Sequence, residues 1–291
     1  MSCLLCDDTG WKPIEELDPS TSSGTRRVVR CDCWRDRVRT RSLAGARIPP
    51  RYRKCDLDNF RTDKDSVIQA VQKCRAFIDA FPVVDKGLLF VGIPGVGKTH
   101  LATAILKEVI RRTGAHGLFY DVRELLRVIR DTYNPVVRST ELDVIKPVLD
   151  AELLVLDDLG AEKTSEWVEE TMNLIVNTRY NQRRPTIFTT NYPDGEIDLK
   201  SPDAVLVERV GQRIYSRLHE MCIFVHIDTL DYRRAGDDAT PETLDRLEKH
   251  GQRSAKNGLP PKAKAARAQL REPAARDGKA DLKWPGGRAG S

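Results

Sequence analysis

The stretch that most constrains the fold is the octapeptide Gly92-Ile93-Pro94-Gly95-Val96-Gly97-Lys98-Thr99. It fits the pattern G-x-x-x-x-G-K-[S/T], follows an apolar run from Gly87 to Val91 and precedes an amphipathic segment from His100 to Arg112. A strand, a glycine-rich loop and a helix in this order form a phosphate-binding loop, whereas an unrelated glycine-rich turn lacks this context. We therefore predict a triphosphate site formed by Gly92, Gly95, Val96, Gly97, Lys98 and Thr99.

The residue types in this loop match the chemistry of a triphosphate. Gly95 and Gly97 allow backbone angles that point successive N–H groups inward, and the following helix presents its positive end to the anion. Pro94 has no N–H, so the expected donors run from Gly95 to Thr99. Lys98 is expected on the β and γ phosphates, and Thr99 is expected to bind Mg²⁺ through its hydroxyl.

Two carboxylates follow another apolar run, from Leu153 to Leu156. Such a run suits a strand buried on both faces of a parallel sheet. We predict that Asp157 holds Mg²⁺ and that Asp158 orients or deprotonates the attacking water. The alternative is a pair of exposed carboxylates at a strand end.

An amide follows a further apolar run that starts at Pro185 and ends at Asn191. On a strand beside that of Asp157, the Asn191 side chain is expected to hydrogen-bond the water or the γ-phosphate. A turn-forming asparagine before Tyr192-Pro193 is the alternative.

The predicted fold is α/β, with a five-stranded parallel sheet flanked by helices and the nucleotide at the carboxyl ends of the strands. The strands are expected at residues 87–91, 117–120, 153–157, 185–191 and 222–227. A helix, a strand and another helix separate Lys98 from Asp157. By analogy of fold, this extra strand argues against small-molecule kinases and GTPases.

Two groups of arginines allow different interpretations. Arg213 and Arg217 are four residues apart on a predicted helix, hence on one face. They are either ordinary surface residues or cations that reach into the site of a neighbouring subunit. Arg179, Arg183 and Arg184 are predicted to form a solvated face, with contact to a DNA backbone as the alternative.

The N-terminus carries two close cysteine pairs, Cys3 with Cys6 and Cys31 with Cys33, separated by a polar segment that includes Pro19 to Gly24. Four thiolates in two pairs close a tetrahedral Zn²⁺ site, and the polar segment cannot form a core unaided. We predict structural zinc, with a redox pair or unligated thiols as alternatives. Four cysteines leave no open position for catalysis.

Composition limits the location and the partners of the chain. The net charge is +5, and residues 251–291 carry ten Lys or Arg and three acidic residues, so the first 250 residues carry −2. The tail is predicted to be disordered, with weak nucleic-acid affinity as the alternative. The N-terminus lacks a basic start followed by an apolar run, and no stretch is long and apolar enough to span a bilayer. We therefore expect a cytoplasmic protein with reduced thiols and no membrane partner.

Residues 26–54 hold eleven Lys or Arg. They suggest a solvated helix leading out of the cysteine module, or a docking surface for an acidic protein or for nucleic acid. Ile48-Pro49-Pro50 is the expected boundary. The predicted domains are a cysteine module at 1–47, a nucleotide domain at 48–234 and a basic tail at 235–291.

Taken together, these motifs resemble those of the DnaC/DnaI-type replicative helicase loaders and the similar IstB transposition ATPases of the AAA+ superfamily. The resemblance runs from about Ile48 to Arg234 and includes Leu153 to Gly160, Thr189-Thr190-Asn191, Gly211 to Arg217 and Asp231-Tyr232-Arg233. It implies that Asn191 is sensor 1, that Arg217 is an arginine finger and that Arg213 lies near the subunit interface. It also implies a fold without a C-terminal helical lid.

The resemblance implies an ATP- and Mg²⁺-dependent ATPase that loads or remodels a replicative DNA helicase on single-stranded DNA and forms a homo-oligomer with ATP. In the loaders an N-terminal module, which carries zinc in some members, binds the helicase. The alternatives are a transposition ATPase that acts on duplex DNA with a transposase, a P-loop phosphotransferase, and a nucleotide-gated adaptor with negligible turnover.

Overall fold

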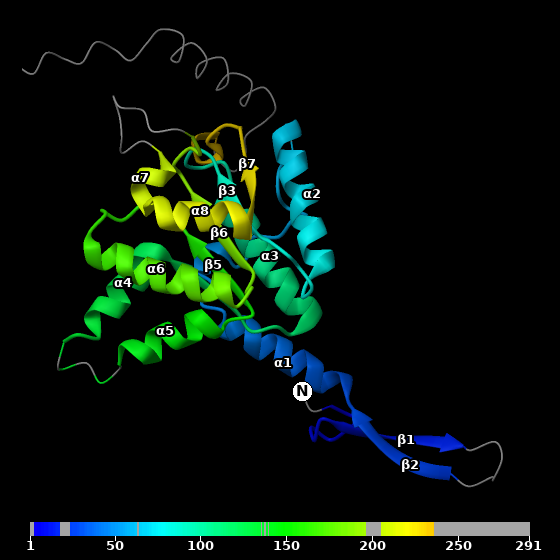
Figure 1. Cartoon of the computed structure of the whole chain (residues 1–291). Coiled ribbons are helices and arrows are strands. Elements are labelled where there is room, and N and C mark those ends of the chain that lie inside the picture. The colour runs from blue at the N-terminus through cyan, green and yellow to red at the C-terminus, as the bar shows by residue number, and fades with distance from the viewer. Residues whose placement is uncertain are drawn as a thin grey trace, which may run out of the picture. The chain divides into compact units, whose positions relative to one another are not determined.

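A computed structural model describes residues 3–17, 24–62, 64–134, 136, 138, 140–195 and 205–235. The segment around Pro19 and the basic tail from 236 onward lie outside these ranges. Figure 1 labels the helices and strands in chain order.

The main sheet has five parallel strands in the order β4-β5-β6-β3-β7. Each is five residues long, and the positions match the predicted apolar runs: β3 (Gly87–Val91), β4 (Gly117–Asp121), β5 (Leu153–Asp157), β6 (Thr186–Thr190) and β7 (Cys222–His226). All residues of β3, β5 and β6 are buried, as expected for strands covered on both faces. The predicted fold class is therefore confirmed.

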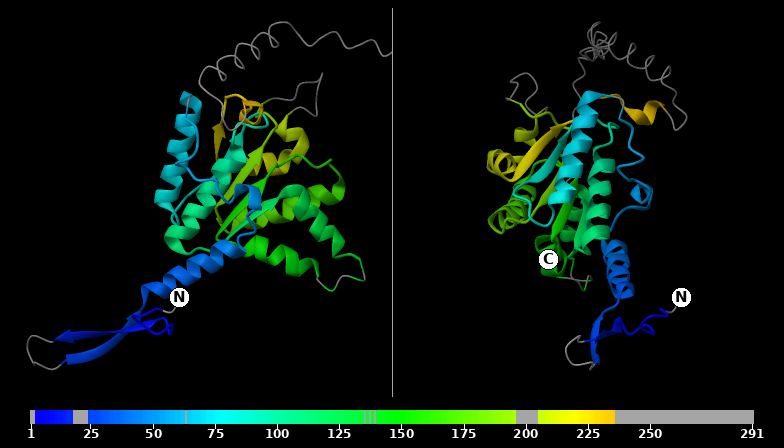
Figure 2. Two further views of the ribbon diagram at one scale, coloured as in Figure 1. Left: turned by 180° about the vertical axis from the view of Figure 1, so that it is seen from behind. Right: turned by 90° about the vertical axis from the view of Figure 1, so that its right-hand side faces the viewer.

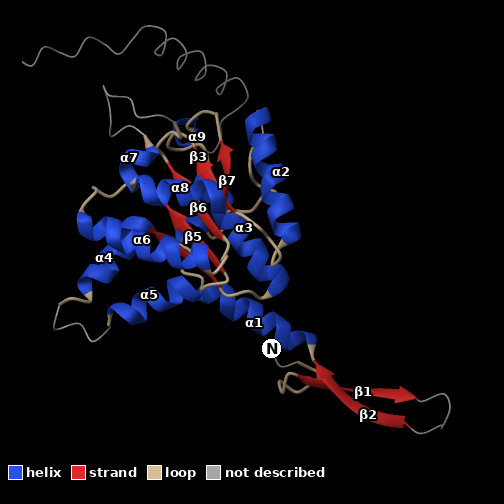
Figure 3. Ribbon diagram, viewed as in Figure 1, coloured by secondary structure: helices blue, strands red, loops and turns tan. Residues whose placement is uncertain are grey.

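Helices cover both faces of this sheet (Figures 2 and 3). One face packs against α2 (Asp65–Ala80) and α3 (Lys98–Thr113). The other packs against α4 (Val122–Asp131), α5 (Glu141–Asp150), α6 (Glu166–Asn181), α7 (Leu206–Val210) and α8 (Gln212–Met221). The described chain ends with α9 (Tyr232–Ala235).

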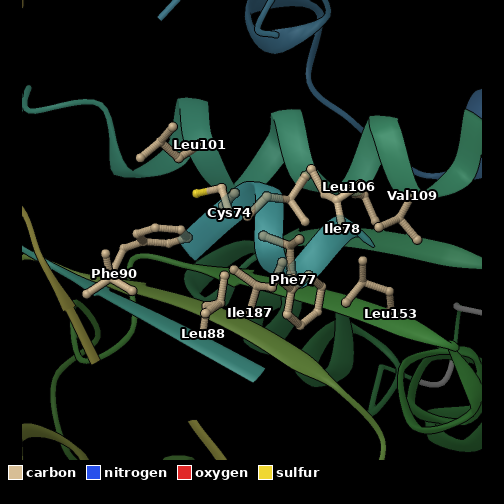
Figure 4. Packing of buried hydrophobic residues seen from close by; sticks show 14 of the residues in the cluster. Cys74, Phe77, Ile78, Leu88, Phe90, Leu101, Leu106, Val109, Leu153 and Ile187 are labelled. Atoms are coloured by element: carbon tan, nitrogen blue, oxygen red, sulfur yellow. The ribbon is translucent and has the colours of Figure 1, made fainter. Parts of the chain in front are cut away.

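Alternation along the strands divides the core into two clusters. Leu88 and Phe90 of β3 join the cluster under α2 and α3, whereas Leu89 and Val91 join the cluster on the opposite face. Figure 4 shows the first cluster, in which Phe77 of α2 faces the strands. Burial of these side chains, at about 25 cal/mol per Å² of apolar surface, holds the strand ends in fixed register.

The N-terminal segment contains structure that its polar composition did not predict. Strands β1 (Trp11–Leu17) and β2 (Gly24–Arg30) pair antiparallel, with Trp11 opposite Arg30. Helix α1 (Asp32–Gly45) follows and contacts α3, where the Ser42 hydroxyl donates to the Gly114 carbonyl. A short helix, η1 (Pro50–Tyr52), occupies the expected boundary.

Arg179 corrects one prediction. It is 1% exposed rather than solvated, and its guanidinium donates five hydrogen bonds of 2.8–3.2 Å. The acceptors are four carbonyls around the C-terminus of α5 and the start of β6, together with the Thr186 hydroxyl. Arg183, in contrast, is exposed. Arg179, near the end of α6, therefore connects the end of α5 to the start of β6. These bonds lie at the amino ends of the strands, opposite the phosphate-binding loop.

Candidate nucleotide-binding site

The phosphate-binding loop joins β3 to α3 and has the backbone that its glycines allow. Gly95 and Gly97 have φ values of 87° and 97°, in the left-handed region. A Cβ on Gly97 would lie 2.5 Å from the Phe60 ring, and one on Gly95 would lie 1.6 Å from Asp231 Oδ1. These positions therefore exclude side chains both by conformation and by space. Val96 is fully buried and anchors the loop in the core.

Lys98, the first residue of α3, extends its amine toward the end of β6. Its Nζ donates to the carbonyls of Gly92 and Ile93, both at 2.8 Å, and to Asn191 Oδ1 at 2.7 Å. Burial lowers the pKa of Lys98 to about 8, although nearby carboxylates oppose the shift. The loop thus presents one strongly desolvated amine at the site.

Thr99 and Asp157 form the arrangement expected for a magnesium site. The Thr99 hydroxyl donates to both carboxylate oxygens of Asp157, at 2.9 and 3.1 Å, and Thr189 donates to Oδ1 at 2.6 Å. Burial raises the pKa of Asp157, with hydrogen bonds from the two threonines acting in the opposite direction. A hydroxyl and a carboxylate at this separation are oxygen ligands of the kind that Mg²⁺ prefers.

Asp158 and Asn191 are in direct contact. Asn191 Nδ2 donates to Asp158 Oδ1 at 2.5 Å, while its own oxygen accepts from Lys98. Asp158 has a φ of 60°, a left-handed conformation that is uncommon for a non-glycine residue and often marks functional turns. Burial raises its pKa, partly offset by Arg123. The amide therefore links the lysine of the loop to the second carboxylate.

These groups line a cavity of about 370 Å³ at the carboxyl edge of the sheet. Its other wall comes from Arg51, Tyr52, Cys55 and His100. Three of these residues, Arg51, Tyr52 and Cys55, come from the segment that precedes α2. Tyr52 carried no recognisable signal, and burial raises its pKa.

Arg233 and Asp121 also line the cavity, and no role was predicted for either. Arg233 lies on α9, directly after Tyr232. The backbone N–H of Tyr232 donates to the Gly95 carbonyl at 3.2 Å. The available signal was its place in the closing Asp231-Tyr232-Arg233 motif. Asp121 ends β4, where its carboxylate accepts from the N–H groups of Arg123 and Glu124 and caps α4.

Arg213 and Arg217 lie on α8 and are not among the residues that line this cavity. Arg213 is exposed, and Arg217 donates to the Arg213 carbonyl at 3.4 Å. Within the described chain, neither cation therefore reaches the nucleotide site of its own subunit. A role for either one at a nucleotide requires a neighbouring subunit.

The four N-terminal cysteines come together at a separate site. All four Sγ atoms lie within 4.8 Å of one another, with Cys3 and Cys31 at 3.7 Å and Cys6 and Cys33 at 3.2 Å. Tetrahedral Zn²⁺ with bonds of about 2.3 Å places its sulfur atoms roughly 3.8 Å apart, so this group fits zinc. The three other cysteines lie elsewhere.

Beside the cysteines, Arg30 is stacked between two tryptophans. Its Cζ lies 3.9 Å from the ring centre of Trp11 and 4.4 Å from that of Trp34. Both rings remain partly exposed, and helix α1 contains no buried residue. The basic segment therefore combines exposed arginines with exposed aromatic surface.

Comparisons with known proteins agree with this geometry. A family model described as IstB-like ATP binding protein matches residues 28–237. The replicative helicase loader DnaC of Escherichia coli strain K12 is 30% identical over 176 residues, which cover 60% of this chain and 68% of DnaC. None of the described helices is long and apolar enough to cross a membrane.

Solved structures place the resemblance in the sheet domain. The crystal structure of the DnaC helicase loader has a TM-score of 0.55 at 36% identity, and it covers 62% of this chain and 100% of that one. The crystal structure of DnaI has a TM-score of 0.51 at 24% identity, over 64% of this chain and 94% of the other, and shows the shared fold alone. The chain therefore belongs to the family of IstB-like ATP-binding proteins and has an AAA+ domain of the DnaC type.

Proposed function

We propose that this protein is a Mg²⁺-dependent ATPase that loads or remodels a replicative DNA helicase on single-stranded DNA. The observation that carries the proposal is the contact chain from Lys98 through Asn191 to Asp158, beside the Thr99–Asp157 pair. It lies in a domain whose full-length structural match is a helicase loader at 36% identity.

Each residue of this chain has a proposed role in hydrolysis. The loop amides and Lys98 bind the β and γ phosphates, and Thr99 and Asp157 hold Mg²⁺, which neutralises developing negative charge. Asp158 accepts a proton from the water that attacks the γ-phosphorus, and ADP leaves. The raised pKa of Asp158 brings the carboxylate closer to the pKa that favours general-base catalysis near neutral pH. Asn191 fixes the orientation of that carboxylate.

The complete site requires a second copy of the chain. Arg217 is proposed to reach the γ-phosphate of a neighbouring subunit, with Arg213 beside it, because neither lines the cavity of its own chain. An arginine supplied in trans stabilises charge in the transition state. ATP would then hold the homo-oligomer together, and hydrolysis would release it.

The remaining segments are proposed to bind partners in the cytoplasm. Residues 1–47, with zinc on the four cysteines, would dock the helicase through their arginines and exposed tryptophans, which are residue types enriched in binding hot spots. The nucleotide domain, residues 48–234, would contact single-stranded DNA. The tail, residues 235–291, would add electrostatic attraction to the nucleic acid.

A second candidate is a transposition ATPase that works on duplex DNA with a transposase. The family model that matches most of the chain favours it, since its description names IstB-like proteins. The two functions differ in the partner and in the strandedness of the DNA.

Hydrolysis is tested by measuring phosphate release by the full-length wild-type protein and by Arg217→Ala and Asp158→Asn variants. Each variant should bind ATP yet lose most turnover. An equimolar mixture should regain activity, because mixed interfaces pair an intact Asp158 with an intact Arg217. A mixture that stays inactive contradicts a site shared between subunits.

The partner is tested by co-sedimentation with the purified hexameric replicative helicase of the same organism, with a transposase as the competing candidate. Helicase binding that is lost in a Cys31→Ser/Cys33→Ser variant supports the loader. Binding to the transposase and to duplex DNA alone supports the second candidate instead. Arg184→Gln, which alters the opposite edge of the sheet, is the matched control.

A further inference from the structure

Arg209, on helix α7, reaches the segment that follows Asp158. Its Nε donates to the Gly160 carbonyl and its Nη2 to the Glu162 carbonyl, both at 2.8 Å. The Thr164 hydroxyl donates back to the Arg209 carbonyl at 3.4 Å. One guanidinium thus holds two carbonyls located two and four residues after the proposed general base.

The same side chain also contacts the segment that follows Asn191. The Arg209 Cζ lies 5.0 Å from the ring centre of Tyr192, the residue directly after Asn191. Gly160 fits between them: a Cβ there would lie 3.0 Å from Arg209 Cβ and 3.2 Å from Tyr192 Cδ2. Arg209 therefore contacts both the segment that follows Asp158 and the residue that follows Asn191.

The Asp158 turn needs such a restraint because its backbone is strained. At a φ of 60° the residue holds a conformation that persists only when surrounding contacts determine it. From the β6 side, the Asp158 N–H donates to Thr189 Oγ1 at 2.9 Å. On the far side of the turn, Arg123 of α4 donates to the Ala161 carbonyl at 3.0 Å. Arg209 donates to the carbonyls of Gly160 and Glu162, the residues on either side of Ala161.

Helix α7 continues into the helix that carries the proposed arginine finger. Only Gly211, with a φ of 81°, separates α7 from α8, which begins at Gln212 and contains Arg213 and Arg217. The two helices pack against each other. Arg209 and the proposed arginine finger therefore lie on two packed helices that are joined by a single residue.

We propose that Arg209 is a positioning residue that keeps the Asp158 and Asn191 turns in register and connects both to the helix that carries Arg217. The proposal rests on the proposed ATPase function. It adds a route by which docking of α8 on one subunit adjusts the catalytic carboxylate of the same subunit.

The test compares Arg209→Gln, Arg209→Lys and the control Arg184→Gln in the full-length protein. Arg184 is a matched control because its guanidinium also donates to a backbone carbonyl, that of Asp150, but at the opposite edge of the sheet. The first measurement is amide hydrogen exchange in segments 158–164 and 190–193, which does not depend on activity. Arg209→Gln should accelerate exchange there, and Arg184→Gln should not.

The second measurement separates binding from turnover. The dissociation constant for a fluorescent ATP analogue should stay within about twofold, because Arg209 is not part of the phosphate-binding loop. The kcat of Arg209→Gln should fall about 10- to 100-fold, the loss expected when a catalytic group is misplaced by a fraction of an ångström to one ångström. Arg209→Lys retains a donor, so its kcat should be higher than that of Arg209→Gln. It also serves as the second variant if Arg209→Gln does not fold.

Unchanged exchange in both Arg209 variants overturns the positioning role, whatever the activity. Faster exchange with an unchanged kcat overturns its importance for catalysis. Faster exchange in a protein whose wild type hydrolyses no ATP leaves the positioning role intact and instead contradicts the proposed ATPase function.

Discussion

Replacement of Arg179 by methionine tests how much its hydrogen bonds stabilise the fold at the amino ends of the strands, opposite the candidate nucleotide site. The arginine side chain is 1% exposed and satisfies four carbonyls and one hydroxyl. Methionine has similar length and no donor, so Arg179→Met deletes all five hydrogen bonds without opening a large cavity.

The expected loss of stability follows from two opposing contributions. Hydrogen bonds to a charged group contribute about 1.5 kcal/mol each at the lower end, hence about 7.5 kcal/mol for five. Burial lowers the pKa of Arg179 from 12.5 to about 9, which corresponds to a cost of about 5 kcal/mol for the buried cation. The bonds therefore exceed the cost by about 2.5 kcal/mol. The variant also leaves buried carbonyls without donors, so the expected loss is at least about 3 kcal/mol.

Urea denaturation followed by circular dichroism measures this loss, and the slope of the transition should stay unchanged. Thermal unfolding should show a midpoint about 6–12 °C lower, since each kcal/mol shifts a domain of this size by about 2–4 °C. Arg184→Gln, a change at a more exposed arginine nearby, should lose less than about 1 kcal/mol. A loss below 1 kcal/mol in Arg179→Met refutes the view that this guanidinium joins α5, α6 and β6.

Three further predictions concern the two sites. Lys98→Ala should abolish ATP binding in a fluorescence titration. In the wild type, the affinity for ATP should fall as the pH rises through about 8, because the Lys98 amine, whose pKa is about 8, loses its proton there. Burial raises the pKa of Asp157, so its ionised form opposes folding at neutral pH. Asp157→Asn should therefore raise the thermal midpoint in magnesium-free buffer and remove the stabilisation by Mg²⁺–ATP, and a lower midpoint contradicts this. Metal analysis should find about one zinc per chain, lost in Cys31→Ser/Cys33→Ser; an unchanged metal content excludes the four-cysteine site.

The sheet and the grouping of residues at the centre of the candidate nucleotide site could be predicted from the sequence because both depend on local patterns. Short apolar runs specify strands buried on both faces, and two of these runs, β5 and β6, end at or directly before a predicted site residue, Asp157 and Asn191. Parallel strands place these ends at one edge, which is why Lys98, Asp157 and Asn191 meet although they are far apart in the chain.

The contacts made by long side chains could not be predicted from local sequence patterns. Arg179 lies on the same face of α6 as Ile175 and Val176, but its charge suggested a solvated position, and only the tertiary fold brings five acceptors around it. The bonds from Arg209 to the Asp158 segment link residues almost fifty positions apart, with no local signal in either segment. The β1–β2 hairpin was missed because its stabilising contacts, such as the stacking of Arg30 on two tryptophans, are not apolar periodicities.

The contact between Gly97 and Phe60 restricts how this protein can vary in evolution. A methyl group at position 97 would collide with the aromatic ring, so the glycine is required by its neighbour as well as by its left-handed backbone conformation. A larger residue at position 60 would press on the loop, and a smaller one would remove its support. Natural variants that keep the conformation of this loop should therefore preserve the size of residue 60, or change it together with the side chains around it.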